Sequence, residues 1–381
     1  MKTVCELNGC AGCMACTDIC PKNAITIKDS LRFYNAIIDE QKCINCNLCH
    51  KICQECHMPD LKYPILWREG WAANPEIRMK SSSGGFATAI TLAFVNSGGI
   101  VYSCSFINGQ FIFTSANSED GVKKFIGSKY VKSNPKGVYK NILMNLEKNK
   151  KVLLLGLPCQ IAAAKNYVGD HEEFYTIDLI CHGTPSPRIL EKFLNEYRYS
   201  LTSIKDITFR VKDCFGLSNE KISFTVPTVQ DYYTMTFLNS ISYTENCYEC
   251  KYARLERVSD LTLGDSWGSK LPKSEKNKGI SLALCQTEKG LRLLKQTNLY
   301  MEEVNLENAV KYNYQLQRPS AKPIQREKFF TMMEAGKKFS RIVWRCYPNR
   351  YIKNSIKTIL YKLKPFRDVG GGVIYKLIII C

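Results

Sequence analysis

The sequence lacks any long hydrophobic run. No uninterrupted apolar stretch approaches the about 18 residues that a membrane-spanning helix requires. The longest one near the C-terminus, residues 373–380, is short and contains Lys376. No apolar segment follows residues 1–5, as it would in a secretory signal peptide. We therefore expect a cytoplasmic protein whose cysteines are reduced thiols or metal ligands, not disulfides.

Two common nucleotide-binding motifs are also missing. The sequence has neither a Walker lysine motif nor a Gly-x-Gly-x-x-Gly turn, so nucleotide binding of those two kinds is not supported. The formal charge of +18 is concentrated in residues 322–381, where 14 Lys and Arg face three acidic residues. No recognised binding motif accompanies this charge, so we expect no nucleic-acid partner.

Cysteine, in contrast, is abundant, with 19 residues in 381. Eight of them form two copies of one spacing, Cys10-x2-Cys13-x2-Cys16-x3-Cys20-Pro21 and Cys43-x2-Cys46-x2-Cys49-x3-Cys53. This repeat is typical of two 4Fe-4S clusters, in which three thiolates of each run bind one cluster and the fourth binds the other. The spacing predicts that cluster one takes Cys10, Cys13, Cys16 and Cys53, and that cluster two takes Cys43, Cys46, Cys49 and Cys20. A zinc or disulfide interpretation would have to explain why four cysteines, not two, recur at the same offsets.

The pattern predicts four regions and an α+β fold class. Residues 1–58 should form a small bacterial-type dicluster ferredoxin domain, with strands at 24–27 and 36–39 and the clusters acting as its core. Residues 59–78, rich in aromatics and Pro, are predicted to be a linker. Residues 79–320 alternate between strands and helices, which predicts a mixed α/β domain, and residues 321–381 form a basic tail.

Consecutive strand–loop–helix units are expected in the second domain. Helices are predicted at 86–96, 161–167 and 187–199, and strands at 100–106, 151–155 and 174–180. Such units favour parallel strands with their loops at the carboxyl edge of the sheet, so Cys159 and Cys181 should be neighbours. Later strands, predicted to be antiparallel, are 207–211, 222–226, 233–238, 261–263 and 281–286.

A third cluster is predicted from four further cysteines. Cys159 and Cys181 lie in turn contexts, and Cys247 and Cys250 form a Cys-x-x-Cys pair. From residue types alone, a zinc site or a redox dithiol remains an equal alternative. The remaining cysteines divide into expected packed thiols, Cys104, Cys285, Cys346 and Cys381, and unassigned residues, Cys5, Cys56 and Cys214.

Other candidate residues have two interpretations each. Ser81-Ser82-Ser83-Gly84-Gly85 precedes a predicted helix, where it could bind a phosphate or simply cap the helix. His182 could donate a proton near a cofactor or make a simple loop hydrogen bond. Asp265 and Trp267 could line a cofactor, or they could form a strand-end turn with a buried ring.

The motifs together resemble the family of coenzyme F-420 hydrogenase/dehydrogenase beta subunits over most of residues 60–320. The resemblance is carried by Ser82-Ser83-Gly84-Gly85, Gly156-Leu157-Pro158-Cys159-Gln160, Asp178-Leu179-Ile180-Cys181-His182-Gly183, and Cys247-x2-Cys250 followed by Gly264-Asp265-Ser266-Trp267-Gly268. It implies FAD beside the third 4Fe-4S cluster. The residues implied to hold the flavin are Ser82, Ser83, Gly84, Gly85, Ser128, Lys129 and Tyr130. Leu157 and Gln54 depart from the family pattern, but neither change removes a ligand.

The function predicted from these features is electron transfer between the clusters and FAD, with His182 as the candidate catalytic residue. Relatives imply a redox partner protein or a small redox coenzyme, and relatives with this layout occur among bacterial polysaccharide biosynthesis genes. The alternatives are a non-catalytic ferredoxin-like subunit that docks to a partner enzyme, and a basic structural protein.

The tail contains a predicted basic amphipathic helix. Its apolar residues fall on one face, Ile352, Ile356, Ile359, Leu360 and Leu363, and its flanking lysines are Lys353, Lys357, Lys362 and Lys364. This pattern suits a peripheral contact with anionic lipid at the inner membrane surface, although the helix could also cover the core.

Overall fold

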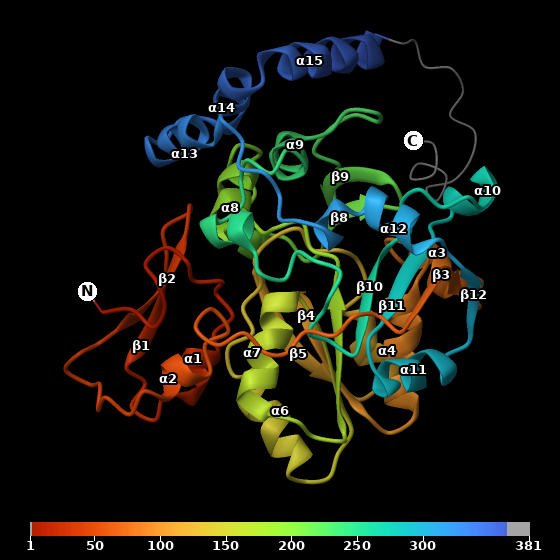
Figure 1. Ribbon diagram of the computed structural model, residues 1–381. Helices are drawn as coiled ribbons and strands as arrows, with labels where there is room; N and C mark the ends of the chain where they lie inside the picture. Colours follow the sequence, from red (N-terminus) through yellow and green to blue (C-terminus); the bar gives the residue numbers. More distant parts are fainter. Residues whose placement is uncertain (1, 364–381) are drawn as a thin grey trace.

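A mixed eight-stranded sheet forms the centre of the protein, as seen in a computed structural model that describes residues 2–363. A small N-terminal module lies beside this sheet, and a group of C-terminal helices packs on a second layer above it (Figure 1). The predicted class is confirmed, because a small module of two strands and two short helices precedes a mixed α/β domain. The predictions for Lys364, for the run 373–380 and for Cys381 lie outside the described residues.

The central sheet has the strand order β12-β3-β11-β10-β7-β6-β4-β5. Along the chain these strands are β3 (Leu66–Ala72), β4 (Ile100–Ile107), β5 (Gln110–Ala116), β6 (Val152–Gly156), β7 (Phe174–Leu179), β10 (Leu261–Asp265), β11 (Ser281–Cys285) and β12 (Leu299–Glu303). β4, β6, β7 and β10 run parallel, and antiparallel strands extend both sides. All residues of β6 are buried, as expected for a parallel strand covered on both faces.

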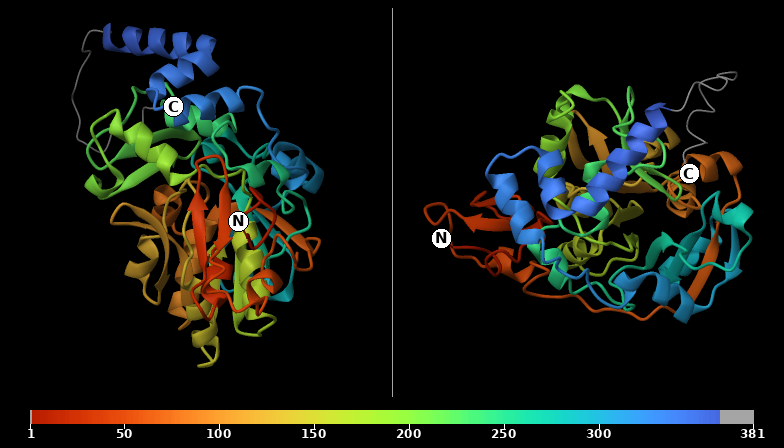
Figure 2. Two further views of the ribbon diagram at one scale, coloured as in Figure 1. Left: turned by 90° about the vertical axis from the view of Figure 1, so that its left-hand side faces the viewer. Right: turned by 90° about the horizontal axis from the view of Figure 1, so that it is seen from above.

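Helices cover both faces of the sheet (Figure 2). α6 (Val138–Leu146) and α7 (Pro158–Val168) cover one face, and α4 (Phe86–Asn96) and α11 (Glu288–Lys295) cover the other. Side chains of β6 alternate between the two layers, because successive residues of a strand point to opposite faces. Val152 and Leu154 pack with α6 and α7, whereas Leu153 and Leu155 pack with α4 and α11.

A second apolar core lies above the sheet, built around a two-stranded ribbon. Its elements are β8 (Ile207–Val211), β9 (Cys214–Asn219), α8 (Pro187–Asn195), α9 (Tyr232–Leu238), α13 (Arg326–Glu334) and α14 (Phe339–Cys346). α15 (Pro348–Leu363) follows α14 at the outer edge of this layer (Figure 1). Shorter helical segments complete the description: α3 (Pro75–Lys80), α5 (Glu119–Lys123), α10 (Lys273–Lys276), α12 (Leu306–Tyr312), η1 (Leu201–Ser203), η2 (Glu245–Glu249) and η3 (Tyr314–Leu316).

The N-terminal module comprises the hairpin β1 (Ile25–Asp29) and β2 (Tyr34–Ile38) with α1 (Ala15–Ile19) and α2 (Leu48–Lys51). It docks on α6 and α7 through hydrogen bonds. The Tyr139 hydroxyl donates to the carbonyl of Cys13 at 2.7 Å, and the Gly137 amide donates to the Asp18 carboxylate at 2.8 and 2.9 Å. The Asn166 side chain of α7 donates to the carbonyls of Ile52 and His57, so the module lies along both helices.

Two strand predictions were wrong. Residues 233–238 form helix α9, because the Asp231 side chain caps it by accepting from the Thr234 amide at 2.8 Å. The strand that pairs with β8 is β9, not residues 222–226. β10, predicted to be antiparallel, pairs in parallel with β7 and antiparallel with β11.

The predicted linker contains a strand of the central sheet. β3 lies between β11 and β12, so this part of residues 59–78 belongs to the second domain. Its Gly70 is required by a close backbone approach, since a Cβ there would lie 1.8 Å from the carbonyl oxygen of Tyr300. Because β3 contains several aromatic and charged residues, the sequence did not indicate a strand here, yet β3 pairs with a neighbouring strand on each edge.

Candidate functional site

The thiols of the N-terminal module fall into two groups that match the predicted interleaving. Cys20, Cys43, Cys46 and Cys49 line one small cavity. The charges of Cys10, Cys16 and Cys53 act on Cys13, so these four lie close together. Two groups of four thiols are what two 4Fe-4S clusters would need, while the assignment of each ligand remains a prediction.

Short helices explain how each run of cysteines serves two sites. Met14 and Asn47 adopt left-handed backbone conformations, with φ of 65° and 61°, immediately before α1 and α2. The third cysteine of each run therefore lies in the first turn of a helix. The fourth, Cys20 or Cys53, follows the helix and is carried to the neighbouring site.

The two thiol groups differ in exposure. Cys10, Cys13, Cys16 and Cys53 are buried, whereas Cys46 is exposed. Burial raises the pKa of Cys13 and of Cys16, so cluster binding must displace protons from these thiols. Within residues 2–363, no three His, Cys, Asp or Glu side chains converge as they would around a single metal ion.

Cys5 and Cys56, which the sequence left unassigned, lie beside the buried thiol group. Cys5 is buried and hydrogen bonds with Cys10 and Cys53, and these bonds raise its pKa. The Cys56 thiol donates to the carbonyl of Val4 at 3.6 Å. The expected packed thiols Cys285 and Cys346 are buried, and Cys104 is partly buried in the core.

Four cysteines from three elements meet at a second cavity beside the module. Its walls include Cys159, Cys181, Cys247 and Cys250. The predicted proximity of Cys159 and Cys181 is confirmed, because both follow adjacent parallel strands, β6 and β7. Cys159 lies in the first turn of α7, not in a loop, and Cys247 lies in η2. Burial raises the pKa of Cys181 to about 12 and of Cys250 to about 11.

A buried ion pair fixes the segment that carries Cys250. The Arg257 guanidinium lies 3.1 Å from the Asp178 carboxylate, and both side chains are fully buried. Arg257 also donates to the carbonyl of Tyr252 at 2.7 Å and of Leu179 at 3.1 Å. Burial raises the pKa of Asp178, and Arg257 opposes this rise. The pair therefore ties the Cys250 segment to the end of β7.

His182 lines the four-cysteine cavity. One ring nitrogen, Nδ1, lies 2.8 Å from the Gln315 amide nitrogen, and the ring edge faces Tyr314. Burial lowers the pKa of His182 to about 4. A neutral imidazole with a fixed partner fits the predicted hydrogen-bonding role better than that of a proton donor, and its catalytic role remains a prediction.

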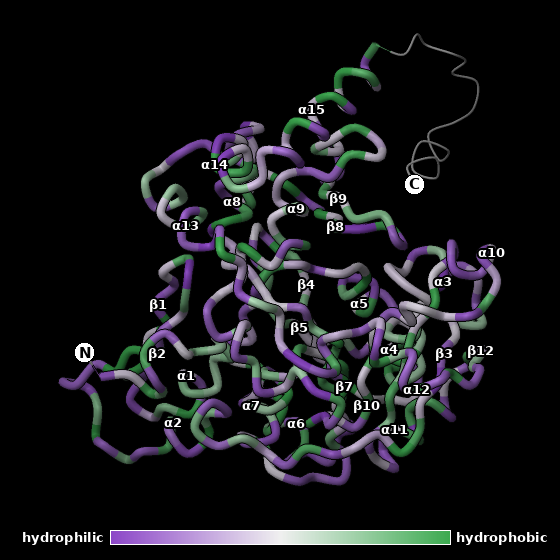
Figure 3. The backbone as a smooth tube through the Cα atoms, turned by 45° about the horizontal axis from the view of Figure 1, so that its top comes forward, coloured by the Kyte–Doolittle hydropathy of each residue, from purple (hydrophilic) through white to green (hydrophobic). Residues whose placement is uncertain are grey.

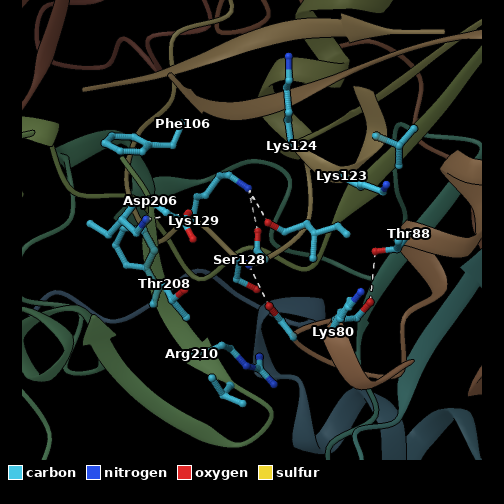
Figure 4. A pocket seen from close by; sticks show the side chains of 18 of the residues that line it. Lys80, Thr88, Phe106, Lys123, Lys124, Ser128, Lys129, Asp206, Thr208 and Arg210 are labelled. Atoms are coloured by element: carbon cyan, nitrogen blue, oxygen red, sulfur yellow. Dashed lines mark hydrogen bonds between the residues drawn. The ribbon is translucent and has the colours of Figure 1, made fainter. Parts of the chain in front are cut away.

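A separate cavity of about 1340 Å³ lies between the sheet and the β8–β9 ribbon. Its cationic side chains are Lys80, Lys123, Lys124, Lys129, Lys205 and Arg210, and its acidic ones are Glu76, Glu119 and Asp206. Figure 4 shows Lys80, Lys123, Lys124 and Arg210 around this space, together with the apolar Phe106. The size and positive charge suit a large anionic ligand that carries an aromatic group.

Only some of the predicted flavin residues line this cavity. Ser82, Ser128 and Lys129 do, and the Ser82 hydroxyl accepts from the Ser128 amide at 2.9 Å. The lining does not include Ser83, Gly84, Gly85 or Tyr130. Gly84 is explained by packing, because a Cβ there would lie 2.5 Å from the carbonyl oxygen of Gly70.

Arg210 links the two cavities. It lines the large cavity, and its guanidinium lies 2.7 Å from the Asp265 carboxylate and 3.3 Å from the Tyr130 hydroxyl. The same guanidinium stacks over Phe215 and, at 5.7 Å, over Trp267. The charge of Asp265 acts on His182 at the four-cysteine cavity. The Arg210–Asp265 pair thus contacts the large cavity and acts on a residue that lines the other.

Lys212 organises the loop before α4. Its ammonium group donates to the carbonyls of Arg78, Ser81 and Ser83, and burial lowers its pKa to about 8. Sequence reasoning missed Lys212, Arg210 and Arg257, because each is a single basic residue outside any motif.

Comparisons with known proteins find similarity in two regions of the chain and over most of its length. Residues 149–309 match the family described as the C terminus of the coenzyme F420 hydrogenase/dehydrogenase beta subunit, and residues 9–55 match the 4Fe-4S dicluster domain. One subunit of the F(420)H(2) dehydrogenase from Methanosarcina mazei is 24% identical over 290 residues, which span 70% of this chain and 79% of that protein. One chain of the F420-reducing NiFe hydrogenase complex from Methanosarcina barkeri is 18% identical, with a TM-score of 0.48. That match covers 72% of this chain and 94% of the other.

The fold and these matches define an iron–sulfur electron-transfer protein with an N-terminal dicluster domain. More particularly, residues 149–309 are similar to the C-terminal domain of coenzyme F420 hydrogenase/dehydrogenase beta subunits, in agreement with the resemblance found in the motifs. This matched region contains all four cysteines of the second cavity. Within residues 2–363, no helix is long and apolar enough to span a bilayer.

Proposed function

We propose that this protein is an FAD-dependent iron–sulfur oxidoreductase with three 4Fe-4S clusters. The observation that carries the proposal is the sequence of sites in space: two four-thiol groups, then the four-cysteine cavity, then the large cationic cavity. When bound, clusters exchange single electrons and a flavin exchanges one or two, so together they can couple a one-electron carrier to a two-electron substrate.

The large cavity is the proposed flavin site. Lys80 and Lys124 supply charge for the diphosphate, and Phe106 supplies an apolar wall for the aromatic rings. The Ser82–Ser128 hydrogen bond joins the two segments implied to hold the flavin. The Lys129 side chain folds back on the second segment and donates to the carbonyls of Ile126 and Gly127.

Four thiols at the second cavity are the proposed site of the third cluster. Cys159, Cys181, Cys247 and Cys250 provide the complete set of ligands that a 4Fe-4S cluster needs. Cys247 is buried and the other three cysteines are partly buried, so much of the site is screened from water. His182 would hold the neighbouring backbone in place through Gln315 and Ser320.

Anaerobic purification tests the proposal through iron, sulfide and flavin content. We expect about 12 iron atoms and one FAD per chain, because each of three clusters holds four irons. Cys247→Ser should lose about four irons and retain the dicluster signals. Material with about eight irons and no flavin would contradict the proposal.

A matched pair of variants tests the flavin site. Lys124→Glu places a negative charge in the large cavity, so it should reduce the flavin content at least tenfold without changing iron content. Lys148→Glu, an exposed change outside the lining, serves as the control. Equal flavin content in both variants would place the flavin elsewhere.

A non-catalytic electron-transfer subunit is the second candidate function. It is favoured by the name of the Methanosarcina mazei relative, which is a subunit of a dehydrogenase. In that case the redox partner is another protein chain, and iron would be present without flavin. The predicted cytoplasmic location and the context of polysaccharide biosynthesis remain parts of the proposal without a structural test.

We also propose that α15 contacts anionic lipid. The helix has no buried residue. The exposed fractions of Ile352, Ile356, Ile359, Leu360 and Leu363 lie between 50% and 71%. Hydrophobic and hydrophilic residues alternate along it (Figure 3), and it carries four basic residues and no acidic one. Tyr351 and Asn354 attach its opposite side to Tyr232 and Gln230. No other part of residues 2–363 buries this apolar face, so the face is available for contact with a membrane surface.

A further inference from the structure

A buried lysine lies between the dicluster module and the four-cysteine cavity. The Lys132 side chain is only 5% exposed, and it lines the cavity together with Ala11 of the module. Its ammonium group donates to the carbonyl of Ala11 at 2.9 Å and lies 5.1 Å from the centre of the Tyr34 ring. These contacts place one positive charge where the two parts of the protein meet.

This charge has no carboxylate partner among the described residues. Its side-chain contacts in residues 2–363 are the Ala11 carbonyl and the Tyr34 ring. Burying an ammonium group without a counter-ion is unfavourable, because the charge loses its hydration. A compensating negative charge is therefore expected close by, and a 4Fe-4S cluster with four thiolates carries a net charge of about −2 when oxidised.

Proposed ligands of both cluster sites lie beside this charge. On the module side, Lys132 donates to the carbonyl of Ala11, the residue next to Cys10. On the other side, Lys132 lines the same cavity as Cys159, Cys181, Cys247 and Cys250. The thiols of the exposed group, Cys20, Cys43, Cys46 and Cys49, line a cavity that does not include Lys132.

Packing holds the lysine in this position. The Lys132 amide donates to the carbonyl of Pro185 at 2.9 Å, which anchors its backbone near the loop after Cys181. Gly12 leaves room for the side chain, since a Cβ at this residue would lie 3.2 Å from Lys132 Cδ and 2.6 Å from the Tyr34 ring.

We propose that Lys132 is a shared counter-ion for two cluster sites, the buried site of the module and the four-cysteine cavity. Its charge stabilises the more negative, reduced form of each cluster, so it raises the reduction potential of both. As a positioning residue it also joins the module to the sheet domain at the point where an electron crosses between them. The part that concerns the third cluster rests on the proposed function, whereas the part that concerns the buried module site does not.

The test compares cluster potentials in the purified holoprotein. Reductive titrations followed by electron paramagnetic resonance would be run on wild type, Lys132→Met and Lys132→Arg, with signals assigned through Cys→Ser variants of each site. We expect Lys132→Met to shift two of the three potentials to more negative values and to leave the Cys20–Cys43–Cys46–Cys49 cluster nearly unchanged. Lys132→Arg should restore values near those of wild type.

A second lysine provides the control for lost packing. Lys192 is half-buried and donates to the carbonyl of Met333, away from all proposed ligands. Lys192→Met should leave every potential unchanged. Unchanged potentials in Lys132→Met with normal iron content would overturn the proposal.

The remaining outcomes also decide the question. If wild type contains only eight irons, the third cluster fails, but the shift at the buried module site still tests Lys132. If Lys132→Met does not assemble its clusters, assembly in Lys132→Arg supports a need for the charge. Failure of both variants to assemble would show that the residue acts through packing alone, and would contradict the proposal.

Discussion

Single basic residues connect the chain segments that form these sites. Arg257, Lys132 and Lys212 are each buried or half-buried, and each donates to a backbone carbonyl of a segment distant in sequence. No sequence motif marks them, because a single lysine or arginine acquires this role only when the fold surrounds it. The cysteines were predictable for the opposite reason, since cluster chemistry fixes their number and spacing.

Arg257 should be among the most costly residues to remove. We expect Arg257→Met to destabilise the protein by about 3–5 kcal/mol, because it leaves the Asp178 carboxylate buried and unpaired. Chemical denaturation of anaerobic protein would measure the change. The control is Arg292→Met, which breaks the exposed pair with Glu172 and should cost less than about 1 kcal/mol. Equal losses in the two variants would contradict this expectation.

At the scale of elements, strands and helices with a clear period were predictable. Residues 86–96 form a helix with the predicted bounds, and β6 and β7 differ from prediction by one residue at their ends. The failures have different causes, because α9 depends on a local cap and β9 on its hairpin with β8, whereas β3 depends on partners distant in sequence. The Asp231 cap makes 232–238 helical despite its β-branched and aromatic residues, and β3 becomes a strand because β11 and β12 flank it.

A deletion of α15 tests the proposal that this helix contacts anionic lipid. Deleting residues 340–381 would also remove buried residues of α14, including Ile342 and Val343, so the deletion should begin at Pro348. We expect this shorter chain to lose sedimentation with vesicles of phosphatidylcholine and phosphatidylglycerol. Wild type should not sediment with phosphatidylcholine alone, because lysines supply much of the attraction.

A full-length variant separates the apolar face from the charge. Replacing Ile352, Ile356 and Ile359 by Ser should weaken vesicle binding while leaving the charge unchanged. Binding equal to that of wild type would remove the membrane proposal, and the helix would then serve another purpose.

At the scale of the whole molecule, the joint between the module and the sheet domain is polar and partly buried. Asp18 accepts from the Gly137 amide across this joint, and burial raises the pKa of Asp18. A carboxyl group whose pKa is raised by folding stabilises the folded state only below its ordinary pKa, and that contribution is lost as pH rises through the raised value. The charge of Asp18 therefore costs stability at neutral pH.

Substitution of Asp18 should reveal this cost. Asp18→Asn keeps an acceptor without the charge, so it should raise the melting temperature at pH 7, and the gain should shrink on acidification. Asp18→Ala leaves the Gly137 amide unsatisfied and should destabilise by about 1–3 kcal/mol. Asp120→Asn, which breaks an exposed pair with Lys123, is the control. A lower melting temperature in Asp18→Asn would show that the charge is favourable.

The division of the cysteines along the chain has a consequence for how the protein is loaded with its inorganic groups. All eight thiols of the module exist once residue 53 has been made, whereas the four-cysteine cavity needs Cys250 and therefore most of the sheet. Iron and sulfide can be delivered to the first two sites while translation continues. The proposed third site can be filled only after Cys250 has been made, so iron starvation should deplete it more than the two sites of the module.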